Sequence, residues 1–376
     1  MTRIAVVTER RPGERRVAAV PDTVAALVRQ GHRVVVQASA GVGAWIPDAD
    51  YRAAGAEVVD GDVLAEADVV LHVRPLSPDD APRLARGAVT IGFMTPAAEP
   101  AGVRALVQAG VTSFAMELVP RISRAQSMDA LTSQALVAGY RCALEAASRL
   151  PRFFPLFMTA AGTVPPAKVL VLGAGVAGLQ AIATARRLGA VVEAYDVRPS
   201  SADEVRSMGA TFVDLGLEAI EGAGGYAREL GEERARRQAE LLAPYVAKAD
   251  ALITTAAVPG RPAPRLVDAG MVAAMRPGSV VVDLAADSGG NVEGVAPGQE
   301  VLVGGVRIVG LADAASAMPV DASRLYAKNL TNLLALMVAD DGSLSLDLGD
   351  EVLAGACVTH DGAVRHEPTR LLLEGL

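Results

Sequence analysis

Aromatic residues and cysteine are scarce in this chain. Only 3% of its 376 residues are aromatic although 51% are hydrophobic, so Ala, Val and Leu supply most of the apolar content, as in buried parallel strands and their covering helices. The two cysteines, Cys142 and Cys357, stand far apart and outside any CxxC spacing, which fits a reducing compartment and predicts no metal site. The composition therefore favours an α/β fold without a bound metal.

Long apolar runs and a basic stripe are also missing. The run LTNLLALMVA, residues 330–339, has the length of a core helix, whereas a bilayer span needs about 20 apolar residues. The first residues show no pattern of a signal or transit peptide. A net charge of −8 with interspersed arginines argues against nucleic-acid binding. We expect a cytoplasmic chain that does not itself insert into a membrane.

Short β-like runs alternate with helical patterns along the chain. This rhythm predicts an α/β fold of two doubly wound parallel-sheet (Rossmann-like) domains with a cleft between them. The segment PRFFPLFMTAAGTVPPAK, residues 151–168, holds four prolines and is predicted to be neither strand nor helix. The expected organisation is a first domain of residues 1–125 plus 340–376, a linking helix at 126–150, a second domain at 151–322 and a returning helix at 323–339.

The second domain opens with VLVLGAGVAGLQAIATARRLGAVVEAYDV. Gly173, Gly175 and Gly178 follow a predicted strand and begin a predicted helix, an arrangement that lets the backbone approach a pyrophosphate. Asp196 stands 18 residues after Gly178, where a carboxylate accepts the adenosine ribose 2′-hydroxyl. This favours NAD(H) over NADP(H), although Arg198 is of the type that holds a 2′-phosphate. A glycine turn without any ligand is the alternative.

Two polar segments have both a structural and a functional interpretation. In PRISRAQSMDALTSQ, residues 120–134, Ser123 and Gln126 form a capping-box pattern that predicts a helix from Arg124; its polar face is either solvated or binds a ligand. In GAGGYARELGEERARRQAE, residues 222–240, glycines and Tyr226 precede a charged helix. That segment is either a solvated connection or a mobile flap that covers a cofactor.

Groups suited to proton transfer are few. The chain has only three lysines and four histidines, none in a motif that looks catalytic, and His72 is interpreted as a core or strand-end residue. A dehydrogenase that oxidises an alcohol or amine moves a proton with the hydride, usually through His or Lys. Hydride exchange between two nicotinamides needs only positioning of the two rings.

With these segments in view, the chain resembles the NAD(H)-binding domain I, or soluble alpha subunit, of proton-translocating NAD(P) transhydrogenase, a relative of alanine dehydrogenase. The resemblance covers essentially the full length and is carried by RRPGERRVAAVPD, PRISRAQSMDALTSQ, PRFFPLFMTAAGTV and the glycine motif. It implies a homodimer that transfers hydride directly between NAD(H) on this chain and NADP(H) on domain III of a beta subunit. Proton translocation would be coupled through a membrane-spanning domain II, with this chain peripheral on the inner membrane face.

The resemblance also implies site residues. The nicotinamide contacts would be Arg121, Gln126, Asp129 and Thr132. The remaining contacts to NAD(H) would come from Gly173, Gly175, Val176, Ala177, Gly178, Asp196, Val197 and Arg198, from the mobile loop at Gly225 and Tyr226, and from Thr255.

Alanine dehydrogenase is the alternative function. The chain shares the early arginine of that enzyme, Arg16, but the expected catalytic lysine appears as Arg74 and the expected histidine falls on Thr95 or Met94. Arginine cannot serve as a base near neutral pH. A third possibility is an NAD(H)-sensing module without hydride chemistry. The segment 310–321 is less typical of the family and can alter a partner surface.

Overall fold

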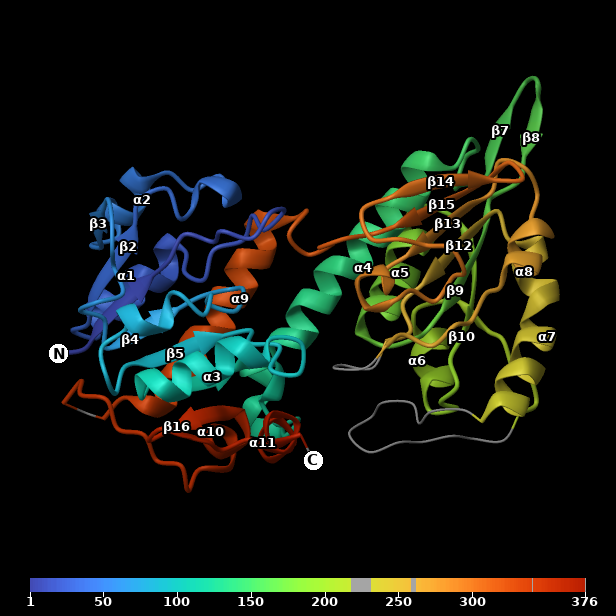
Figure 1. The fold of residues 1–376 in the computed structure, drawn as a ribbon. Helices are drawn as coiled ribbons and strands as arrows, with labels where there is room; N and C mark the ends of the chain where they lie inside the picture. Colours follow the sequence, from blue (N-terminus) through green and yellow to red (C-terminus); the bar gives the residue numbers. More distant parts are fainter. Residues whose placement is uncertain (218–230, 258–261, 340, 376) are drawn as a thin grey trace. The chain divides into compact units, whose positions relative to one another are not determined.

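The structure is a computed structural model that describes residues 1–217, 231–257, 262–339 and 341–375. The chain divides into two compact units, both drawn in Figure 1. Unit 1 consists of Met1–Gln134 and Ser316–Leu376, and unit 2 of Ala135–Ala315. The predicted loop residues Gly225 and Tyr226 lie outside the described residues.

Unit 1 is built on an eight-stranded sheet with the order β17-β16-β6-β5-β4-β1-β2-β3. The first six strands along the chain are parallel, and β16 and β17 add antiparallel to the edge at β6. The strands are β1 (Arg3–Val6), β2 (Arg33–Gln37), β3 (Glu57–Val59), β4 (Val69–Leu71), β5 (Val89–Gly92), β6 (Thr112–Ala115), β16 (Cys357–His360) and β17 (Ala363–Val364).

Both faces of this sheet are buried, because successive residues of a strand point to opposite faces. Ile4 and Val6 belong to one hydrophobic cluster and Ala5 and Val7 to another. Helices α1 and α9 contribute to the first cluster and α3 to the second. The helices of unit 1 are α1 (Pro21–Arg29), α2 (Asp48–Ala53), α3 (Pro100–Ala109), α9 (Pro319–Leu334), α10 (Glu351–Ala356) and α11 (Glu367–Glu374).

Unit 2 is built on a seven-stranded sheet with the order β11-β10-β9-β12-β13-β15-β14. All neighbours are parallel except β14, which runs antiparallel to β15. The strands are β9 (Lys168–Leu172), β10 (Val191–Tyr195), β11 (Thr211–Phe212), β12 (Ala251–Thr254), β13 (Val280–Asp283), β14 (Glu300–Val303) and β15 (Val306–Gly310).

Helices cover both faces of this second sheet as well. Val169 and Val171 of β9 pack in one cluster with α4, α5 and α6, whereas Leu170 and Leu172 pack in the other with α7 and α8. The helices are α5 (Val176–Arg187), α6 (Ser201–Ser207), α7 (Glu232–Lys248) and α8 (Ala269–Ala273), and α4 (Ala130–Arg149) begins in unit 1 and ends in unit 2. The predicted α/β class with two doubly wound units is confirmed, with antiparallel strands added at the sheet edges.

The prediction that residues 151–168 hold no strand is wrong. Strands β7 (Phe157–Thr159) and β8 (Gly162–Val164) form an antiparallel hairpin, which extends away from the unit 2 sheet in Figure 1. The prolines of this segment lie before β7 and after β8, so they border the hairpin instead of removing its hydrogen-bond donors. Gly162, at φ +130°, supplies the backbone conformation that the turn needs.

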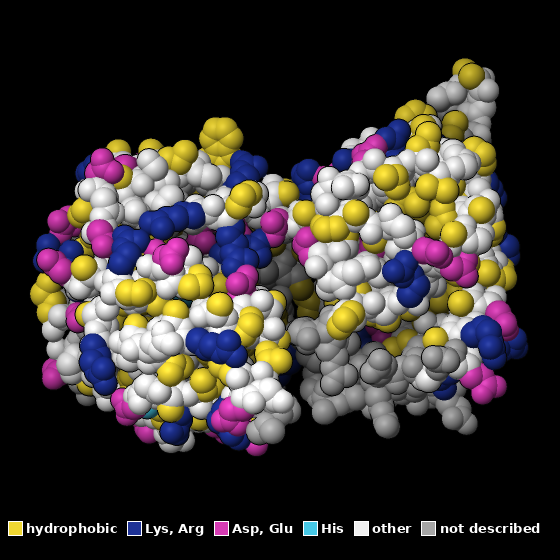
Figure 2. Space-filling model, viewed as in Figure 1, with side chains coloured by type: hydrophobic (Ala, Val, Ile, Leu, Met, Phe, Trp, Pro, Cys, Tyr) yellow, Lys and Arg dark blue, Asp and Glu magenta, His cyan; other side chains and the backbone are white. Residues whose placement is uncertain are grey.

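Within the described residues, no helix is both long and apolar enough to cross a membrane. On the face of unit 1 shown in Figure 2, basic and acidic side chains are interspersed.

Candidate functional site

The chain turns sharply between β9 and α5. Gly173 adopts φ +98°, which favours glycine, and its N–H donates to the Tyr195 carbonyl oxygen at 2.8 Å. A Cβ on Gly178 would overlap the carbonyl oxygen of Gly173, so glycine is required there for α5 to start this close to the turn. Gly175 occupies the cap position of α5 without a capping side chain. The first N–H groups of α5 are therefore suited to binding a phosphate.

Asp196 follows β10 and closes this turn from the side. Its side chain is 7% exposed, and its Oδ2 accepts the backbone N–H of Ala174 at 2.7 Å. The same carboxylate accepts Nε and Nη2 of Arg198 at 2.9 and 3.0 Å. Arg198 is thus held against Asp196 by a two-point ion pair. The carboxylate lies beside the turn, where the acidic residue of a dinucleotide site accepts a ribose hydroxyl.

Three of the predicted contacts lie around the same turn. The Thr255 hydroxyl donates to the Gly173 carbonyl oxygen at 3.0 Å, so Thr255 stabilises the turn itself. Val176 is exposed at the first position of α5, whereas Val197 packs partly buried against the hydrophobic cluster of α7 and α8. Val197 therefore has a packing role, and its contact to NAD(H) stays a prediction.

Two buried polar residues that were not singled out from the sequence support the strand ends near Thr255. The Asn291 amide donates to the carbonyl oxygens of Ala256 and Pro264, each at 2.8 Å, and accepts the Ala256 N–H at 3.1 Å. Asp283 accepts three backbone N–H groups, and burial raises the pKa of its carboxyl. Asn291 lies in the segment PGSVVVDLAADSGGN, residues 277–291, and nothing in the spacing of that segment indicates which carbonyl groups its side chain reaches.

Gly139 in α4 is a further residue that the sequence pattern did not reveal. A Cβ at this position would overlap the carbonyl oxygen of Ala177, so α4 and the first turn of α5 approach each other at backbone distance. A single glycine inside a predicted helix is usually a weak signal. Here it lets α4 support the helix start that would bind the phosphate.

Asp129 and Thr132 lie together at the start of α4. Asp129 Oδ1 accepts the Thr132 backbone N–H at 2.8 Å, and Oδ2 accepts the Thr132 hydroxyl at 2.7 Å. The predicted capping box at Ser123 is therefore wrong. Residues Ser123–Met128 form a 3₁₀ helix without a side-chain cap, and α4 begins only at Ala130. The Asp129 side chain satisfies one of the orphan N–H groups of α4, that of Thr132, and the helix starts six residues later than predicted.

The other two predicted nicotinamide contacts, Arg121 and Gln126, have exposed side chains in unit 1. Arg124, from the same segment, forms a two-point ion pair with Asp350 at 2.8 and 3.0 Å. One part of the segment, at Arg124, is thus attached to the start of α10, and the next part forms a turn that contains Gln126 and Asp129.

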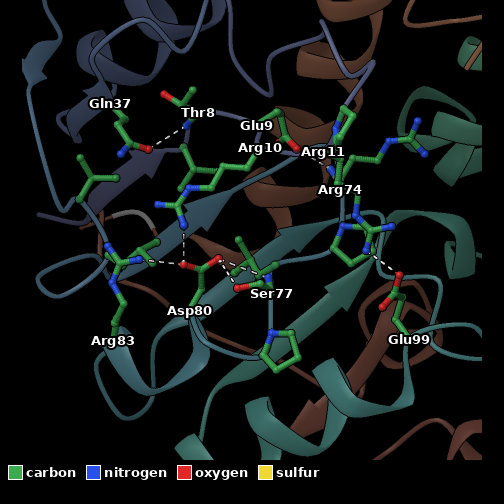
Figure 3. Close-up of a pocket in the computed structure, with 17 residues that line it drawn as sticks. Thr8, Glu9, Arg10, Arg11, Gln37, Arg74, Ser77, Asp80, Arg83 and Glu99 are labelled. Carbon is green, nitrogen blue, oxygen red and sulfur yellow. Dashed lines mark hydrogen bonds and ion pairs between the residues drawn. The ribbon is translucent and has the colours of Figure 1, made fainter.

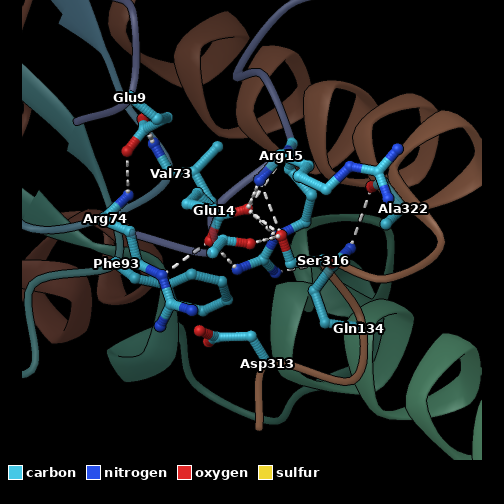
Figure 4. A network of polar contacts seen from close by, with 12 residues as sticks. Glu9, Glu14, Arg15, Val73, Arg74, Phe93, Gln134, Asp313, Ser316 and Ala322 are labelled. Carbon is cyan, nitrogen blue, oxygen red and sulfur yellow. Dashed lines mark hydrogen bonds and ion pairs between the residues drawn. The ribbon is translucent and has the colours of Figure 1, made fainter. Parts of the chain in front are cut away.

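The loop after β1 forms a buried ionic network, shown in Figure 4. The Glu14 side chain is fully buried and accepts Arg16 Nη2 and Arg74 Nε, each at 2.6 Å. Burial by itself raises the pKa of Glu14, but hydrogen bonding and charge from Arg16 and the charge of Arg74 hold it at about 2. Arg16 also donates to Gln134 Oε1 at 2.9 Å. Glu14 thus pairs with Arg16 and with Arg74, which stand where alanine dehydrogenase is expected to have its early arginine and its catalytic lysine.

A charged pocket of about 280 Å³ lies where β1, β2 and β4 end in unit 1, as Figure 3 shows. Arg83 and Arg10 both donate to Asp80 Oδ1, at 2.8 and 3.2 Å. Glu9 accepts the N–H groups of Val73 and Arg74 at 2.6 and 3.1 Å. Burial raises the pKa of Glu9 to about 7 in spite of these two hydrogen bonds. The pocket has no glycine turn of the kind found in unit 2.

His72 and Thr95 lie near the positions where alanine dehydrogenase would carry its proton-transfer groups. His72 is 2% exposed, its Nδ1 lies 2.7 Å from the Arg74 carbonyl oxygen, and burial lowers its pKa to about 4. The Thr95 N–H donates to Glu117. Both residues are thus engaged with the protein backbone or with a buried carboxylate.

The glycine turn, the helix start and the adjacent acidic strand end define a Rossmann-type dinucleotide-binding protein with two doubly wound units. The alanine dehydrogenase/PNT N-terminal domain matches residues 5–138 and the C-terminal domain matches residues 142–367. The chain belongs to the alanine dehydrogenase/PNT family.

Its relatives lie on both branches of that family. The chain is 48% identical to an NAD(P) transhydrogenase alpha subunit of Rhodospirillum rubrum, over 97% of this chain and 98% of that protein. A transhydrogenase structure from Sinorhizobium meliloti has a TM-score of 0.86 and 46% identity, covering 97% and 99% of the two chains. Alanine dehydrogenase of Mycobacterium tuberculosis is 34% identical over 97% of this chain and 95% of that enzyme. The predicted resemblance to the transhydrogenase alpha subunit is confirmed.

Proposed function

We propose that this chain is the NAD(H)-binding subunit of a proton-translocating NAD(P) transhydrogenase. NAD(H) bound here supplies or receives hydride at its nicotinamide C4, in direct exchange with NADP(H) on a separate domain III. Proton translocation is coupled to this exchange through a membrane-spanning domain II. The observation that carries the proposal is the hydrogen bond from the Ala174 N–H to Asp196 at 2.7 Å, because it places a carboxylate against a glycine turn.

In this proposal, different residues bind the two ends of the dinucleotide. Gly173, Gly175 and Gly178 leave space for a pyrophosphate, and Asp196 accepts a ribose hydroxyl and disfavours a 2′-phosphate by charge. Asp129, Thr132, Gln126 and Arg121 orient the nicotinamide carboxamide in this proposal. Their contribution is positioning, which is the main requirement when no substrate atom gains or loses a proton.

The alternative, oxidation of an amino acid, fits the network around Glu14 poorly. Arg74 stands where that reaction needs a lysine, and its Nε donates to Glu14 at 2.6 Å. Arg16 donates from all three guanidinium nitrogens to Glu14 and Gln134. A substrate carboxylate would have to displace a buried internal one. Among the described residues, no contact specifically favours the NAD(H)-sensing alternative.

The test is a reconstituted hydride transfer. The chain is mixed with an NADP(H)-binding domain III, and reduction of an NAD⁺ analogue by NADPH is followed by absorbance. We expect turnover only when both components are present. In a parallel assay, NADH oxidation with pyruvate and ammonium should be absent. Robust activity in the parallel assay would replace the proposal with alanine dehydrogenase, and binding of NADH without turnover in either assay would favour a sensing module.

We further propose that the subunit is a homodimer, peripheral on the inner membrane face through domains II and III. The hairpin β7–β8 supports self-association, because its exposed apolar side chains have few neighbours; Figure 2 shows hydrophobic side chains along it. Leu156 and Met158 are 52% and 76% exposed, and Phe153 and Phe157 form an edge contact with ring centroids 4.7 Å apart. Exposed apolar patches of this kind mark protein interfaces. Sedimentation equilibrium should give a dimer, and Met158→Asp should weaken it.

A further inference from the structure

The predicted nicotinamide contacts lie on a turn whose shape must be maintained by other residues. Asp129 joins the end of the 3₁₀ helix Ser123–Met128 to the first residue of α4 and has φ −72° and ψ +90°. Among the described residues, its side chain forms hydrogen bonds only with Thr132. These bonds fix Asp129 relative to α4 but do not hold the arm that carries Gln126. The relative placement of Gln126 and Asp129 therefore depends on contacts from outside the turn.

Asn329 of α9 supplies those contacts to both arms. It is 7% exposed, its Nδ2 donates to the Ser127 carbonyl oxygen at 2.8 Å, and its Oδ1 accepts the Ser133 hydroxyl at 2.7 Å. A carbonyl oxygen can only accept, so the amide nitrogen must face Ser127 and the amide oxygen must face Ser133. One buried amide in one orientation thus connects the residue two before Asp129 to the residue four after it.

A second amide fixes α4 to the same helix. The Nε2 of Gln134 donates to the Ala322 carbonyl oxygen at 3.1 Å, and its Oε1 accepts Arg16 Nη1 at 2.9 Å. Ala322 and Asn329 are seven residues apart on α9, which is about two turns or 10 Å. Attachment at two such points fixes the rotation of the first turn of α4 as well as its distance from α9.

The two attachments differ in what they reach. Gln134 and Arg16 hold α4, and Arg124 ties the start of the 3₁₀ helix to Asp350. Within the described residues, the side-chain hydrogen bonds that reach Ser127, next to Gln126, come from asparagines of α9: Asn332 also donates to the Ser127 carbonyl oxygen, at 2.9 Å, but is more exposed than Asn329. Of the side chains that the structure describes, only that of Asn329 forms hydrogen bonds with both arms. Its removal would leave a carbonyl group and a hydroxyl group short of partners at the turn.

We propose that Asn329 is a positioning residue for hydride transfer. It sets the orientation of the Gln126–Asp129 turn, and through that turn the placement of the nicotinamide ring. The role rests on the proposed function, and it assigns to α9 a part in the reaction beyond its packing in the core of unit 1. A misplacement of about 1 Å at a reacting centre can lower a rate by about a hundredfold, so a small shift of the turn is sufficient.

The test replaces Asn329 with leucine, which keeps the volume but cannot bond Ser127 or Ser133. The full chain is assembled with an NADP(H)-loaded domain III, single-turnover hydride transfer is measured by stopped flow, and NADH affinity is measured by calorimetry. We expect Asn329→Leu to slow transfer by about tenfold or more while the Kd for NADH changes less than about threefold. The affinity is spared because the adenosine and pyrophosphate contacts lie in unit 2.

Two further variants on α9 serve as comparisons for the transfer rate of Asn329→Leu. Thr331→Ala removes an exposed hydroxyl that bonds only the Lys328 carbonyl oxygen and should leave the rate unchanged. Asn332→Leu should give a smaller loss than Asn329→Leu, since Ser127 keeps its bond to Asn329. Amide hydrogen exchange should become faster from Ser127 to Gln134 in Asn329→Leu but stay unchanged in β9.

The outcomes distinguish a positioning role of Asn329 from an effect on folding, and they distinguish failure of this role from failure of the proposed function. A transfer rate per folded Asn329→Leu molecule within about twofold of the unsubstituted chain would overturn the positioning role, as would an equal loss of NADH affinity. If Asn329→Leu does not fold, Ser133→Ala removes one of the two bonds and should still slow transfer by about threefold. If the unsubstituted chain transfers no hydride, the proposed function falls, and this role of Asn329 falls with it.

Discussion

The two sheets share one topology but carry different chemistry at corresponding strand ends. In each sheet, the first strand has the second strand on one side and the first strand of the sheet's other half on the opposite side, as in β2-β1-β4 and β10-β9-β12. Ligands of doubly wound sheets bind where the strand order reverses in this way. Unit 2 has a glycine turn and Asp196 at that place, whereas unit 1 has a long charged loop with Glu9 and Glu14. Topology thus selects where a site can form, and the loop after the first strand decides what it can bind.

Of the substitutions that test this difference between the units, filling the glycine turn of unit 2 should have the largest effect. Gly178→Ala places a Cβ on the carbonyl oxygen of Gly173, so we expect loss of NADH binding by at least about a hundredfold, with lower stability. Gly175→Ala is the matched control for folding, because a Cβ there meets no atom within 4 Å. It should fold normally and weaken NADH only through the approach of the pyrophosphate. Calorimetry and thermal unfolding would distinguish the two variants, and equal behaviour would contradict this account of the turn.

Removing the acid from the unit 2 site should change which nucleotide it prefers. Asp196→Asn removes the charge that repels a 2′-phosphate and weakens the hold on Arg198, so the preference for NADH over NADPH should fall by about tenfold or more. Asp203→Asn, which removes an ion pair with Arg206 at a carboxylate that is 93% exposed, should leave the preference intact. Titration of each variant with both nucleotides measures the ratio. An unchanged ratio in Asp196→Asn would refute the assignment of the ribose contact.

In unit 1, substitutions of Gln126 and Asp129 should distinguish an effect on hydride transfer from an effect on stability. Gln126→Ala removes an exposed side chain, so it should slow hydride transfer by about tenfold without lowering the unfolding midpoint. Asp129→Ala should slow transfer as well and also cost about 1 kcal/mol, because it removes the cap of α4. Stopped-flow transfer and urea unfolding measure the two effects. Wild-type transfer rates in both variants would move the nicotinamide contacts elsewhere.

The smallest expected effect concerns pH and unit 1 alone. The pKa of Glu9 rises on folding from 4.5 to about 7, so the folded state favours its protonated form, and this contribution to stability is present below pH 4.5 and lost as the pH rises to about 7. Glu14, with a pKa lowered to about 2, behaves oppositely and loses its contribution only as the pH falls from 4.5 toward 2.

Urea unfolding at pH 5 and pH 8 checks the Glu9 contribution. Glu9→Gln cannot ionise, so its unfolding midpoint should fall less between these two pH values than that of the unsubstituted chain. Glu57→Gln, at an exposed pair with Arg33, serves as the comparison. Parallel pH profiles for the unsubstituted chain and Glu9→Gln would show that Glu9 does not titrate in this range.

Local patterns in the sequence were sufficient for the glycine turn in unit 2, but not for the residues that support that turn or for the residue that supports the Gln126–Asp129 turn in unit 1. The positive φ of Gly173 and the placement of Asp196 after the next strand follow from short-range spacing. Asn291, Gly139 and Asn329 act through partners that are distant in sequence, such as Ser127 for Asn329, and no periodicity records such pairs. Their roles became visible only in the folded structure.

Where local signals competed, the sequence interpretation failed. Ser123 and Gln126 match a capping box, but Asp129 is a stronger cap three residues before Thr132 and determines the start of α4. The prolines near the hairpin β7–β8 suggested an irregular segment, although they only border it. The assignments of Gly225 and Tyr226, which lie outside the described residues, stay predictions, as do all the other predicted ligand contacts.

The buried pair of Glu14 and Arg16 restricts how this loop can evolve. Their side chains are 0% and 6% exposed, and removing one partner of such a pair leaves an uncompensated charge, at a cost of about 3 to 5 kcal/mol. Single substitutions at either position are therefore selected against, and exchange requires two changes at once. Positions 14 and 16 are thus coupled through one buried ion pair, so the loop after β1 should tolerate substitutions at its exposed residues far better than a single substitution at either of these two.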